Sequence, residues 1–303
     1  MKIDLHMHTS KSDGADTPEE FLAKVRAAGI DLFSVTDHDT NAGALAVAEL
    51  LAAEAPADGQ DGQTGQVMKR GDLRFLPGIE FSCKDPEGKY HILGYGCDPE
   101  HPDFLATLAE VRRVRLAKAE GRVTFLKETF GLVLPEEELQ KFYALESPTK
   151  PVLADIVAAC GFAEDRQDAM GRFIDKFKHE FYLRPEKAIE GILAAGGVPV
   201  LAHPSFGDGG QYITGKEMED RLRRLMDFGL EGLEVFYSEF TPELIAELLG
   251  YAEKYDLYVT AGSDYHGTEY HGPMGITHLT AEEEWPAGLL RFLERVGLAG
   301  GRA

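Results

Sequence analysis

Histidines and acidic residues recur at the ends of short apolar segments, and this recurrence constrains the fold more than any other feature of the sequence. His6 and His8 end the first such segment, and alternate side chains of a strand leave the same face, so both imidazoles point the same way. Six of the ten histidines and three acidic residues lie at such positions, which are His6, His8, Asp13, His38, Glu80, His91, His203, Asp264 and His266. These side chains can act together only if the fold brings the segment ends to one place.

The apolar segments alternate with helical patterns, which predicts an α/β fold with parallel strands covered by helices. In α/β barrels the carboxyl ends of the strands converge on one mouth, where catalytic residues gather. A barrel-like domain is therefore the expected way to assemble the nine residues. Helices are expected from Thr17 to Gly29 and over residues 41–54. Strands are expected at residues 2–6, 31–36, 73–81, 89–94, 198–202, 232–236 and 257–261.

Two stretches depart from this alternation. Residues 56–71 are rich in Gly, Gln and Asp without periodicity, which predicts an exposed, mobile insertion. Residues 99–185 contain several helical patterns, including a continuous one over 104–130, and no clear strand. The expected organisation is a discontinuous barrel domain at 1–98 and 186–303, interrupted by a helical insertion at 99–185 that could form a cap over the site.

The chain carries 52 acidic and 31 basic side chains, a formal net charge of −21 at pH 7. Such a surface disfavours a long polyphosphate partner, so long nucleic acid is not expected. The three cysteines are too few and too scattered for a disulfide framework or a thiolate metal site. With no apolar run of signal-peptide or membrane-span length, a cytoplasmic protein without membrane contact is the expected setting.

The nine residues mix imidazoles with carboxylates, a donor set that suits divalent Mn, Fe or Zn. A single histidine at a strand end, such as His91, is more often a hydrogen-bonded structural residue than a metal ligand. The recurrence of histidines with interleaved carboxylates nevertheless favours a metal site, and nine candidates exceed what one ion needs. Two or three divalent ions are therefore expected.

Six motifs occur in order along nearly the whole chain: DLHMHTSKSDG, SVTDHDT, GIEFS, YHILGY, LAHP and AGSDYH. Together they resemble the PHP (polymerase and histidinol phosphatase) family of metal-dependent phosphoesterases. The resemblance implies a distorted seven-stranded (βα) TIM-like barrel with an inserted helical subdomain and with metal ions at its C-terminal mouth.

The same resemblance implies three sets of metal ligands around Glu80, which bridges the first two. The first set is His6, His8, Glu80 and Asp264; the second is Glu80, His91 and His203; the third is Asp13, His38 and His266. Many members of the family carry histidine where this chain has Asp13. The chain thus resembles the subgroup with aspartate there, in which Asp13 is free for proton transfer.

A hydroxide between two divalent ions is a nucleophile near neutral pH, because the metals lower the pKa of bound water. It can attack phosphorus in line with the leaving oxygen, while the ions neutralise the other phosphate oxygens. Glu80, as the bridging carboxylate, is an expected catalytic residue. The leaving alkoxide needs a proton, for which Asp13 or a nearby imidazole, such as that of His203, is the candidate donor.

Candidates for substrate binding come from loops and from one basic helix face. Lys150 in SPTKP and Arg184 in FYLRP are each expected beside a helix of the insertion. Ser205 follows His203 in a glycine-rich loop that forms either a pocket wall or a plain turn.

Arg115, Lys118 and Arg122 are spaced three and four residues apart, so they share one face of a predicted helix. That face could hold a substrate phosphate away from the metals. A solvated face paired with neighbouring glutamates is the favoured interpretation.

The expected function is that of an enzyme, a phosphoric ester hydrolase acting on a small phosphorylated substrate. The substrate is a phosphomonoester, a cyclic phosphodiester, or both, of a sugar or nucleotide. Two alternatives are a histidinol-phosphate phosphatase and a single-strand 3'-5' exonuclease or oligonucleotide phosphodiesterase, and the net charge argues against the latter. A metal-binding regulatory protein without turnover is disfavoured by the complete ligand set.

Overall fold

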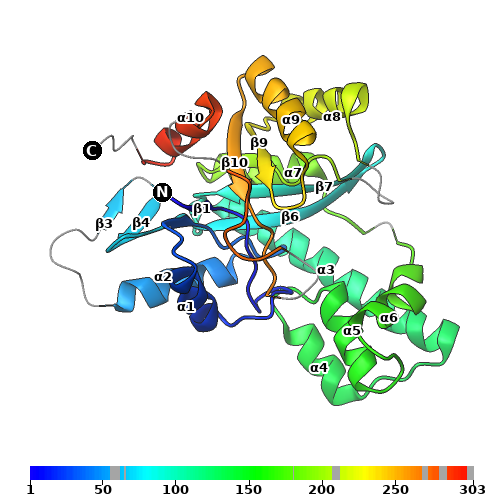
Figure 1. Cartoon of the computed structure of the whole chain (residues 1–303). Coiled ribbons are helices and arrows are strands. Elements are labelled where there is room, and N and C mark those ends of the chain that lie inside the picture. Colours follow the sequence, from blue (N-terminus) through cyan, green and yellow to red (C-terminus); the bar gives the residue numbers. More distant parts are fainter. Residues whose placement is uncertain are drawn as a thin grey trace.

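The computed structural model describes residues 1–54, 62–64, 66–179, 181–206, 212–267, 272–279 and 285–298. In these residues strands and helices alternate toward both ends of the chain, and the middle is helical (Figure 1). The strands are β1 (Ile3–Asp4), β2 (Leu32–Phe33), β3 (Gly62–Thr64), β4 (Val67–Arg70), β5 (Leu73–Phe75), β6 (Gly78–Asp85), β7 (Gly88–Tyr95), β8 (Val198–Leu201), β9 (Gly232–Tyr237) and β10 (Tyr258–Gly262). The helices are α1 (Pro18–Ala27), α2 (Ala42–Ala53), α3 (Pro102–Phe130), α4 (Glu136–Ala144), α5 (Lys150–Ala159), α6 (Arg166–Arg172), the 3-10 helix η1 (Ile174–Lys176), α7 (Pro185–Ala194), α8 (Gly215–Asp227), α9 (Pro242–Lys254) and α10 (Ala287–Arg295).

The strands form two five-stranded sheets. The first has the order β1-β2-β5-β4-β3, with β1, β2 and β5 parallel and β4 and β3 antiparallel. The second has the order β10-β9-β8-β7-β6, with β8, β9 and β10 parallel and the β6–β7 hairpin antiparallel. Strands β3 and β4 lie where the sequence predicts an irregular insertion, so that prediction is wrong for residues 62–64 and 67–70. Of the predicted insertion, residues 56–61 and residue 65 lie outside the described residues.

The prediction of a seven-stranded TIM-like barrel is wrong, because the two sheets do not close on one another in the described part of the chain. They are linked by isolated bridges, such as Met7 with Tyr265 and His38 with Glu80, where a barrel would have continuous ladders. The fold is therefore mixed α/β with two separate sheets.

The first two strands, β1 and β2, are too short for hydrogen-bonded ladders to continue from one sheet to the other. Strands β1 and β2 are each two residues long. Beyond them single backbone bonds remain, such as that from the N–H of Thr36 to the carbonyl of Met7 at 2.9 Å. Other backbone groups bond to side chains: the N–H of Met7 donates to Thr36 Oγ1 at 3.2 Å, and the N–H of Thr9 donates to Asp37 Oδ1 at 2.8 Å. Short polar side chains compete in this way with sheet hydrogen bonds. The loops that carry the histidines consequently lie between the two sheets.

Helices α1 and α2 lie beside the first sheet, and α7 to α10 beside the second (Figure 1). Helix α1 begins where the sequence predicts, because Thr17 and Glu20 form a reciprocal capping box and Pro18 occupies the first turn. Ile192 of α7 and Phe292 of α10 are fully buried in the main hydrophobic cluster, which fixes both helices to the second sheet.

Helix α3 connects this core to a second group of helices. Phe104 and Val111 near its start belong to the main hydrophobic cluster. Leu126 near its end belongs to a separate cluster with residues such as Phe142 and Leu153 of α4 and α5. Figure 1 shows α4, α5 and α6 gathered around this end of α3, away from the two sheets. That these helices close over the site as a cap stays a prediction.

None of the helices in the described ranges combines the length and the apolar run that crossing a bilayer requires.

Candidate metal centre

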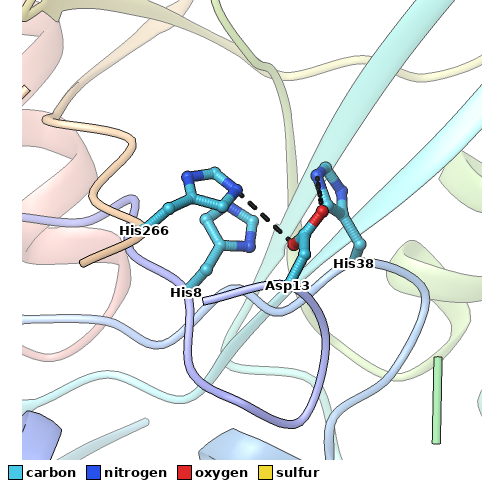
Figure 2. Close-up of side chains that lie close together, drawn as sticks. All are labelled: His8, Asp13, His38 and His266. Carbon is cyan, nitrogen blue, oxygen red and sulfur yellow. Dashed lines mark ion pairs between the residues drawn. The ribbon is translucent and has the colours of Figure 1, made fainter. Parts of the chain in front are cut away.

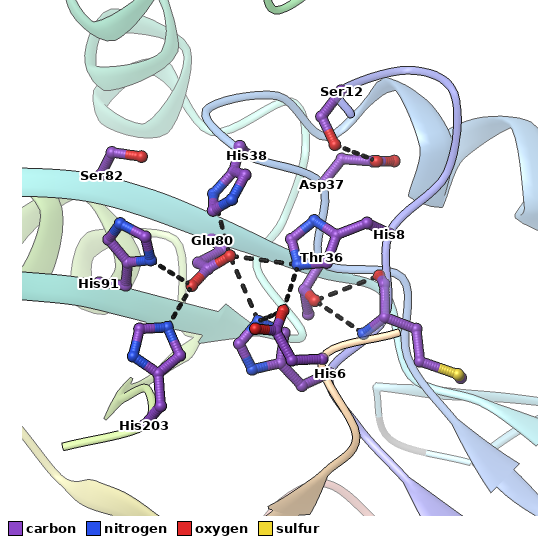
Figure 3. A network of polar contacts seen from close by, with 12 residues as sticks. His6, His8, Ser12, Thr36, Asp37, His38, Glu80, Ser82, His91 and His203 are labelled. Atoms are coloured by element: carbon purple, nitrogen blue, oxygen red, sulfur yellow. Dashed lines mark hydrogen bonds and ion pairs between the residues drawn. The ribbon is translucent and has the colours of Figure 1, made fainter. Parts of the chain in front are cut away.

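The structure brings all nine candidate ligands to one buried site between the sheets. Figure 3 shows the part of the site around Glu80, and Figure 2 shows the part around Asp13. Glu80 and His91 stand on strands β6 and β7 of the hairpin. The other seven follow strands β1, β2, β8 and β10, where the chain leaves each sheet. They are His6, His8, Asp13, His38, His203, Asp264 and His266.

A first group combines His6 and His8 with the carboxylates of Glu80 and Asp264. His6 Nε2 lies 3.2 Å from Glu80 Oε2 and 3.3 Å from Asp264 Oδ1. His8 Nε2 lies 3.3 Å and 3.1 Å from the same two oxygens. Two imidazole nitrogens and two carboxylate oxygens therefore surround one point, as four ligands of a single cation would.

A second group joins His8 to Asp13, His38 and His266. Figure 2 shows Asp13 between His266 and His38. Its Oδ1 lies 3.5 Å from His266 Nε2 and its Oδ2 4.0 Å from His38 Nε2. The rings of His8 and His266 stack with centroids 4.1 Å apart. His8 thus faces both groups, in contrast to the expected sets, where it serves the first ion only.

Glu80 lies at the middle of the site. Its Oε2 faces the first group and is 3.0 Å from His38 Nδ1. Its Oε1 lies 2.8 Å from His91 Nδ1 and 3.3 Å from His203 Nε2. A third candidate ligand group consists of His38, Glu80 and His91, and His203 lies beside it without being part of it. The two oxygens of Glu80 therefore face different sets of imidazoles, which is the placement a bridging carboxylate needs.

The unpaired atoms of the site fit divalent cations. Buried polar atoms normally have a hydrogen-bond partner. Six ligand atoms here have none in the ranges that the structure covers, and these are His6 Nε2, His8 Nδ1, His8 Nε2, Asp13 Oδ1, His38 Nδ1 and Glu80 Oε2. Nitrogen and oxygen donors that converge without hydrogen bonds are well placed to share a metal ion.

The charges of the site depend on one another. Burial would raise the pKa of the Glu80 carboxyl, but the imidazoles of His38, His6 and His91 hold it well below its usual range. Burial would lower the pKa of His6 and of His38, but the carboxylates that face them, Glu80 above all for His38 and Glu234 for His6, raise it. Burial lowers the pKa of His91 to about 4. Metals bind ionised carboxylates and neutral imidazoles, so a divalent cation here would take the place of the protons on His6 and His38.

Glu234 of β9 supports the site from behind and was not among the residues predicted from the sequence. Its side chain is fully buried, with Oε1 2.9 Å from His6 Nδ1 and Oε2 accepting the backbone N–H of His203 at 2.7 Å. One carboxylate thus orients two candidate ligands from different strands. The available signal was an acidic residue inside the otherwise apolar strand GLEVFY, which is buried throughout.

Replacing Glu234 with Gln is expected to weaken metal binding about 10–100-fold. The amide oxygen can still accept the N–H of His203, but the amide NH₂ then faces His6 Nδ1 and makes that nitrogen an acceptor. The ring proton moves to His6 Nε2, the atom that faces Glu80 and Asp264. Isothermal titration of metal-free protein with Mn measures the loss. Glu231→Gln, at the residue before the same strand, is the matched control, and equal affinities in the two variants would contradict this role.

Asp37 and Asp39 both act on the loops of the site, where the sequence left positioning and turn roles equally open. Asp37 accepts hydrogen bonds from the N–H and hydroxyl of Thr9 and from Ser12, at 2.6–2.8 Å, and so fixes the turn that carries Asp13. Asp39 accepts the N–H of Ser82 on β6 at 2.7 Å and pairs with Arg115 of α3.

Backbone strain gathers in the same loops. Asp39, His203 and Asp264 have positive φ angles of 58°, 27° and 55°, a region that L-residues with a Cβ seldom adopt. Strain of this kind persists where the surrounding structure fixes the residue, as it often does at functional sites.

The predicted substrate-binding residues do not share one environment. Lys150 Nζ pairs with Asp175 at 2.6 Å, and Arg184 Nε pairs with Glu186 at 2.9 Å, both near the surface. Ser205 is buried just after His203, and its hydroxyl has no hydrogen-bond partner among the described residues. Their role in substrate binding stays a prediction.

The favoured interpretation of the basic face of α3 is wrong, because its three cations are buried. Arg115, Lys118 and Arg122 are 8%, 3% and 4% exposed. Arg115 reaches the metal centre, where it pairs with Asp39 and donates to Ser82 Oγ at 2.9 Å.

Curated proteins of three kinds are similar to this chain over most of its length. A 3',5'-nucleoside bisphosphate phosphatase of Chromobacterium violaceum is 29% identical over 271 residues, 87% of each chain. The 5'-3' exoribonuclease Rnm of Escherichia coli is 28% identical over 87% of this chain and 84% of its own. A phosphoribosyl 1,2-cyclic phosphate 1,2-diphosphodiesterase of Eggerthella lenta is 29% identical over 87% and 94%. No protein-family model matches the chain.

Two solved structures share the fold of nearly the whole chain. A protein assigned as a metal-dependent phosphoesterase from Bifidobacterium adolescentis superposes with a TM-score of 0.75 at 26% identity, over 97% of this chain and 96% of its own. An amidohydrolase of Chromobacterium violaceum, with bound sulfate and no metal, gives the same TM-score and identity over 98% and 97%. These similarities confirm the resemblance to the PHP family of metal-dependent phosphoesterases and, with it, the prediction that the chain is a phosphoric ester hydrolase.

Proposed function

We propose that this chain hydrolyses small phosphorylated metabolites, as a phosphomonoesterase, a cyclic phosphodiesterase, or both, with a sugar or nucleotide as the leaving group. The observation that carries the proposal is the convergence of nine imidazole and carboxylate side chains on one site, with Glu80 at its middle. The proposed cofactors are two or three divalent ions, Mn, Fe or Zn, which such donors bind. The three free cysteines favour a reducing, cytoplasmic setting.

We propose the following distribution of ligands. The first ion is held by His6, His8, Glu80 and Asp264, the second by Glu80, His91 and His203, and the third by Asp13, His38 and His266. His38 Nδ1 lies 3.0 Å from Glu80 Oε2, and His8 also belongs to the group of Asp13, His38 and His266, so both histidines could serve a neighbouring ion as well. When bound, the ions would lower the pKa of water and neutralise phosphate oxygens.

The chain's own residues have three tasks in this reaction. Glu80 holds the two halves of the site at a fixed separation, with one oxygen toward each. Asp13 and His203 are the proposed residues for moving a proton to the departing oxygen. The buried walls around His6 and His8 exclude bulk water.

The named relatives support a phosphate ester of a sugar or nucleotide as the substrate. One is a nucleoside bisphosphate phosphatase and another acts on a phosphoribosyl cyclic phosphate. Both reactions break a P–O bond by attack of water on phosphorus, and one site can serve a monoester and a cyclic diester. Histidinol phosphate stays a minor alternative.

A second candidate function, exonucleolytic cleavage of RNA, is favoured by one observation. The relative from Escherichia coli is named as a 5'-3' exoribonuclease and aligns over 87% of this chain. The net charge of −21 disfavours it, because a long polyphosphate would be repelled by most of the surface. We therefore place it second, and expect any nucleic-acid activity to be limited to short ends.

Phosphate release from purified protein loaded separately with Mn or Zn tests both functions. The panel contains sugar phosphates, nucleoside mono- and bisphosphates, 1,2- and 2',3'-cyclic phosphates, histidinol phosphate and short oligonucleotides. Fast turnover of one class of small molecule, with oligonucleotides inert, is the expected result. Preference for oligonucleotides would favour the nuclease. No turnover with metals bound would contradict both proposals.

A further inference from the structure

A β-bulge in strand β9 lies next to the metal centre. Thr260 of β10 pairs with Glu234 of β9. The next residue of β10, Ala261, pairs with Phe236, so Val235 is an extra residue in β9. An extra residue shifts the alternation of side chains, so that residues three apart come to share a face of the strand. Bulges beside functional sites often direct a side chain toward the site in this way.

The bulge brings Tyr237 to the same side of β9 as Glu234, which accepts the backbone N–H of His203. The hydroxyl of Tyr237 donates a hydrogen bond to Asp264 Oδ2 at 3.0 Å. The centre of the Tyr237 ring also lies 5.7 Å from that of His203. In a regular strand Phe236, two residues after Glu234, would share its face. The bulge therefore gives the metal centre a phenol where simple alternation would place a phenylalanine.

The contact between Tyr237 and Asp264 is shielded from water, since the two residues are 3% and 8% exposed. The rings of Phe206 and Phe240 pack on Tyr237, with their centres 5.5 Å and 5.0 Å from its own, and hold its hydroxyl in place. A hydrogen bond to an ionised acceptor is stronger than one between neutral groups, and a surrounding of low dielectric constant strengthens it further. The contact can therefore set the orientation of the Asp264 carboxylate.

Asp264 needs such support because its backbone is strained, with a φ angle of 55° in the left-handed region. The preceding residue, Ser263, is fixed to Asp4 by hydrogen bonds from its N–H and its hydroxyl, at 2.9 Å and 2.6 Å. Ser238 Oγ donates to the carbonyl of Ser263 at 2.9 Å. These bonds hold the backbone of the loop, and the bond from Tyr237 holds the side chain of Asp264.

The two oxygens of the Asp264 carboxylate have different neighbours. Oδ1 lies 3.3 Å from His6 Nε2 and 3.1 Å from His8 Nε2, within the first group of candidate ligands. Oδ2 accepts the hydroxyl of Tyr237. A carboxylate can bind a cation through one oxygen or through both, and hydrogen bonds from neighbouring groups orient it. A donor on the second oxygen favours binding through the first oxygen alone, which leaves more room around the cation for other ligands.

We infer that Tyr237 is a positioning residue of the metal centre. Its hydroxyl directs Asp264 Oδ1 at the first ion and keeps Asp264 a ligand through one oxygen, which reserves a coordination position for water or for a phosphate oxygen of the substrate. The inference rests on the proposed function, because it takes the proposed first ion as given. The ring of Tyr237 packs against His203, a proposed ligand of the second ion, so one side chain beside the bulge supports both halves of the site.

Metal binding without turnover tests this role in Tyr237→Phe, which removes the hydroxyl and keeps the ring against His203. Isothermal titration of metal-free protein should show an affinity for Mn about 10–100-fold below that of the wild type, because the carboxylate of Asp264 is no longer held toward the first ion. In protein loaded with cobalt(II), the visible absorption bands of the ion should become weaker. Asp264 can then bind through both oxygens, and a higher coordination number weakens these bands. Tyr258→Phe makes the same change at the start of β10 and is the matched control.

A second variant separates the ring from the hydroxyl. Tyr237→Leu removes both and should lose more affinity for Mn than Tyr237→Phe, because His203 then loses its aromatic neighbour. Circular dichroism checks that each variant is folded. A cobalt spectrum of Tyr237→Phe equal to that of Tyr258→Phe would overturn the positioning role, whatever the affinity for Mn. If the wild type binds neither metal, the proposed function and this inference fail together, whereas an unchanged spectrum in a protein that binds metal overturns the inference alone.

Discussion

Replacing Glu80 with Gln is expected to lower kcat/KM by about 10³-fold or more while the protein stays folded. Glu80 faces both halves of the site, with Oε2 3.0–3.3 Å from His6, His8 and His38 and Oε1 2.8–3.3 Å from His91 and His203. The amide has the same shape but no charge, and its NH₂ group cannot bind a metal. One half of the site therefore loses its anionic ligand.

Three measurements separate this loss from misfolding: phosphate release with the best substrate of the panel, metal content after dialysis, and far-ultraviolet circular dichroism. The variant should retain fewer metal ions per chain than the wild type. Glu87→Gln is the matched control, because it makes the same change at the exposed turn of the same hairpin. Activity near that of Glu87→Gln would exclude a bridging role for Glu80.

The positions of the candidate ligands could be predicted from the sequence because they depend on local rules. His6 and His8 share a face through the two-residue period of extended chain, and His8, His38, His203 and His266 each follow an apolar segment that ends at a polar turn. These relations hold in two open sheets as well as in a barrel. The site is therefore assembled although the predicted barrel is wrong.

Whether the sheets close into a barrel could not be predicted from the sequence by such local rules. Whether β1 extends depends on which partners its backbone finds, and the N–H groups of Met7 and Thr9 bind Thr36 and Asp37 instead of a neighbouring strand. These partners lie about thirty positions away and leave no periodic signal in either segment.

Burial of the basic face of α3 depends on residues that are even more distant. The spacing of Lys118 and Arg122 defines their common face, but Phe177 and Tyr182 cover it from the far end of the helical segment. Glu234 escaped prediction for a related reason, since a single acid within an apolar strand shows its purpose only when His6 lies opposite.

Replacing Arg115 with Met is expected to lower the free energy of unfolding by about 3–5 kcal/mol, the usual cost of leaving one partner of a buried ion pair uncompensated. The side chains of Arg115 and Asp39 are 9% and 1% exposed, so neither charge is well hydrated. Their contact, with the hydrogen bond from Arg115 to Ser82, joins α3 to the loop after β2 and to β6.

A double-mutant cycle with Asp39→Asn isolates this contact. The asparagine oxygen can still accept the N–H of Ser82, so the variant chiefly removes the charge. Each single variant leaves one buried group without its counter-charge, whereas the double variant removes both charges. The double variant should therefore lose clearly less free energy of unfolding, measured in urea, than the two single variants lose together. Arg112 lies on the same helix and forms an exposed ion pair with Glu146. Replacing it with Met should lower the free energy of unfolding by less than about 1 kcal/mol. Additive effects in the cycle would show that the charges do not depend on one another, and the connection of α3 to the metal centre would then rest on its apolar contacts, such as those of Phe104 and Val111.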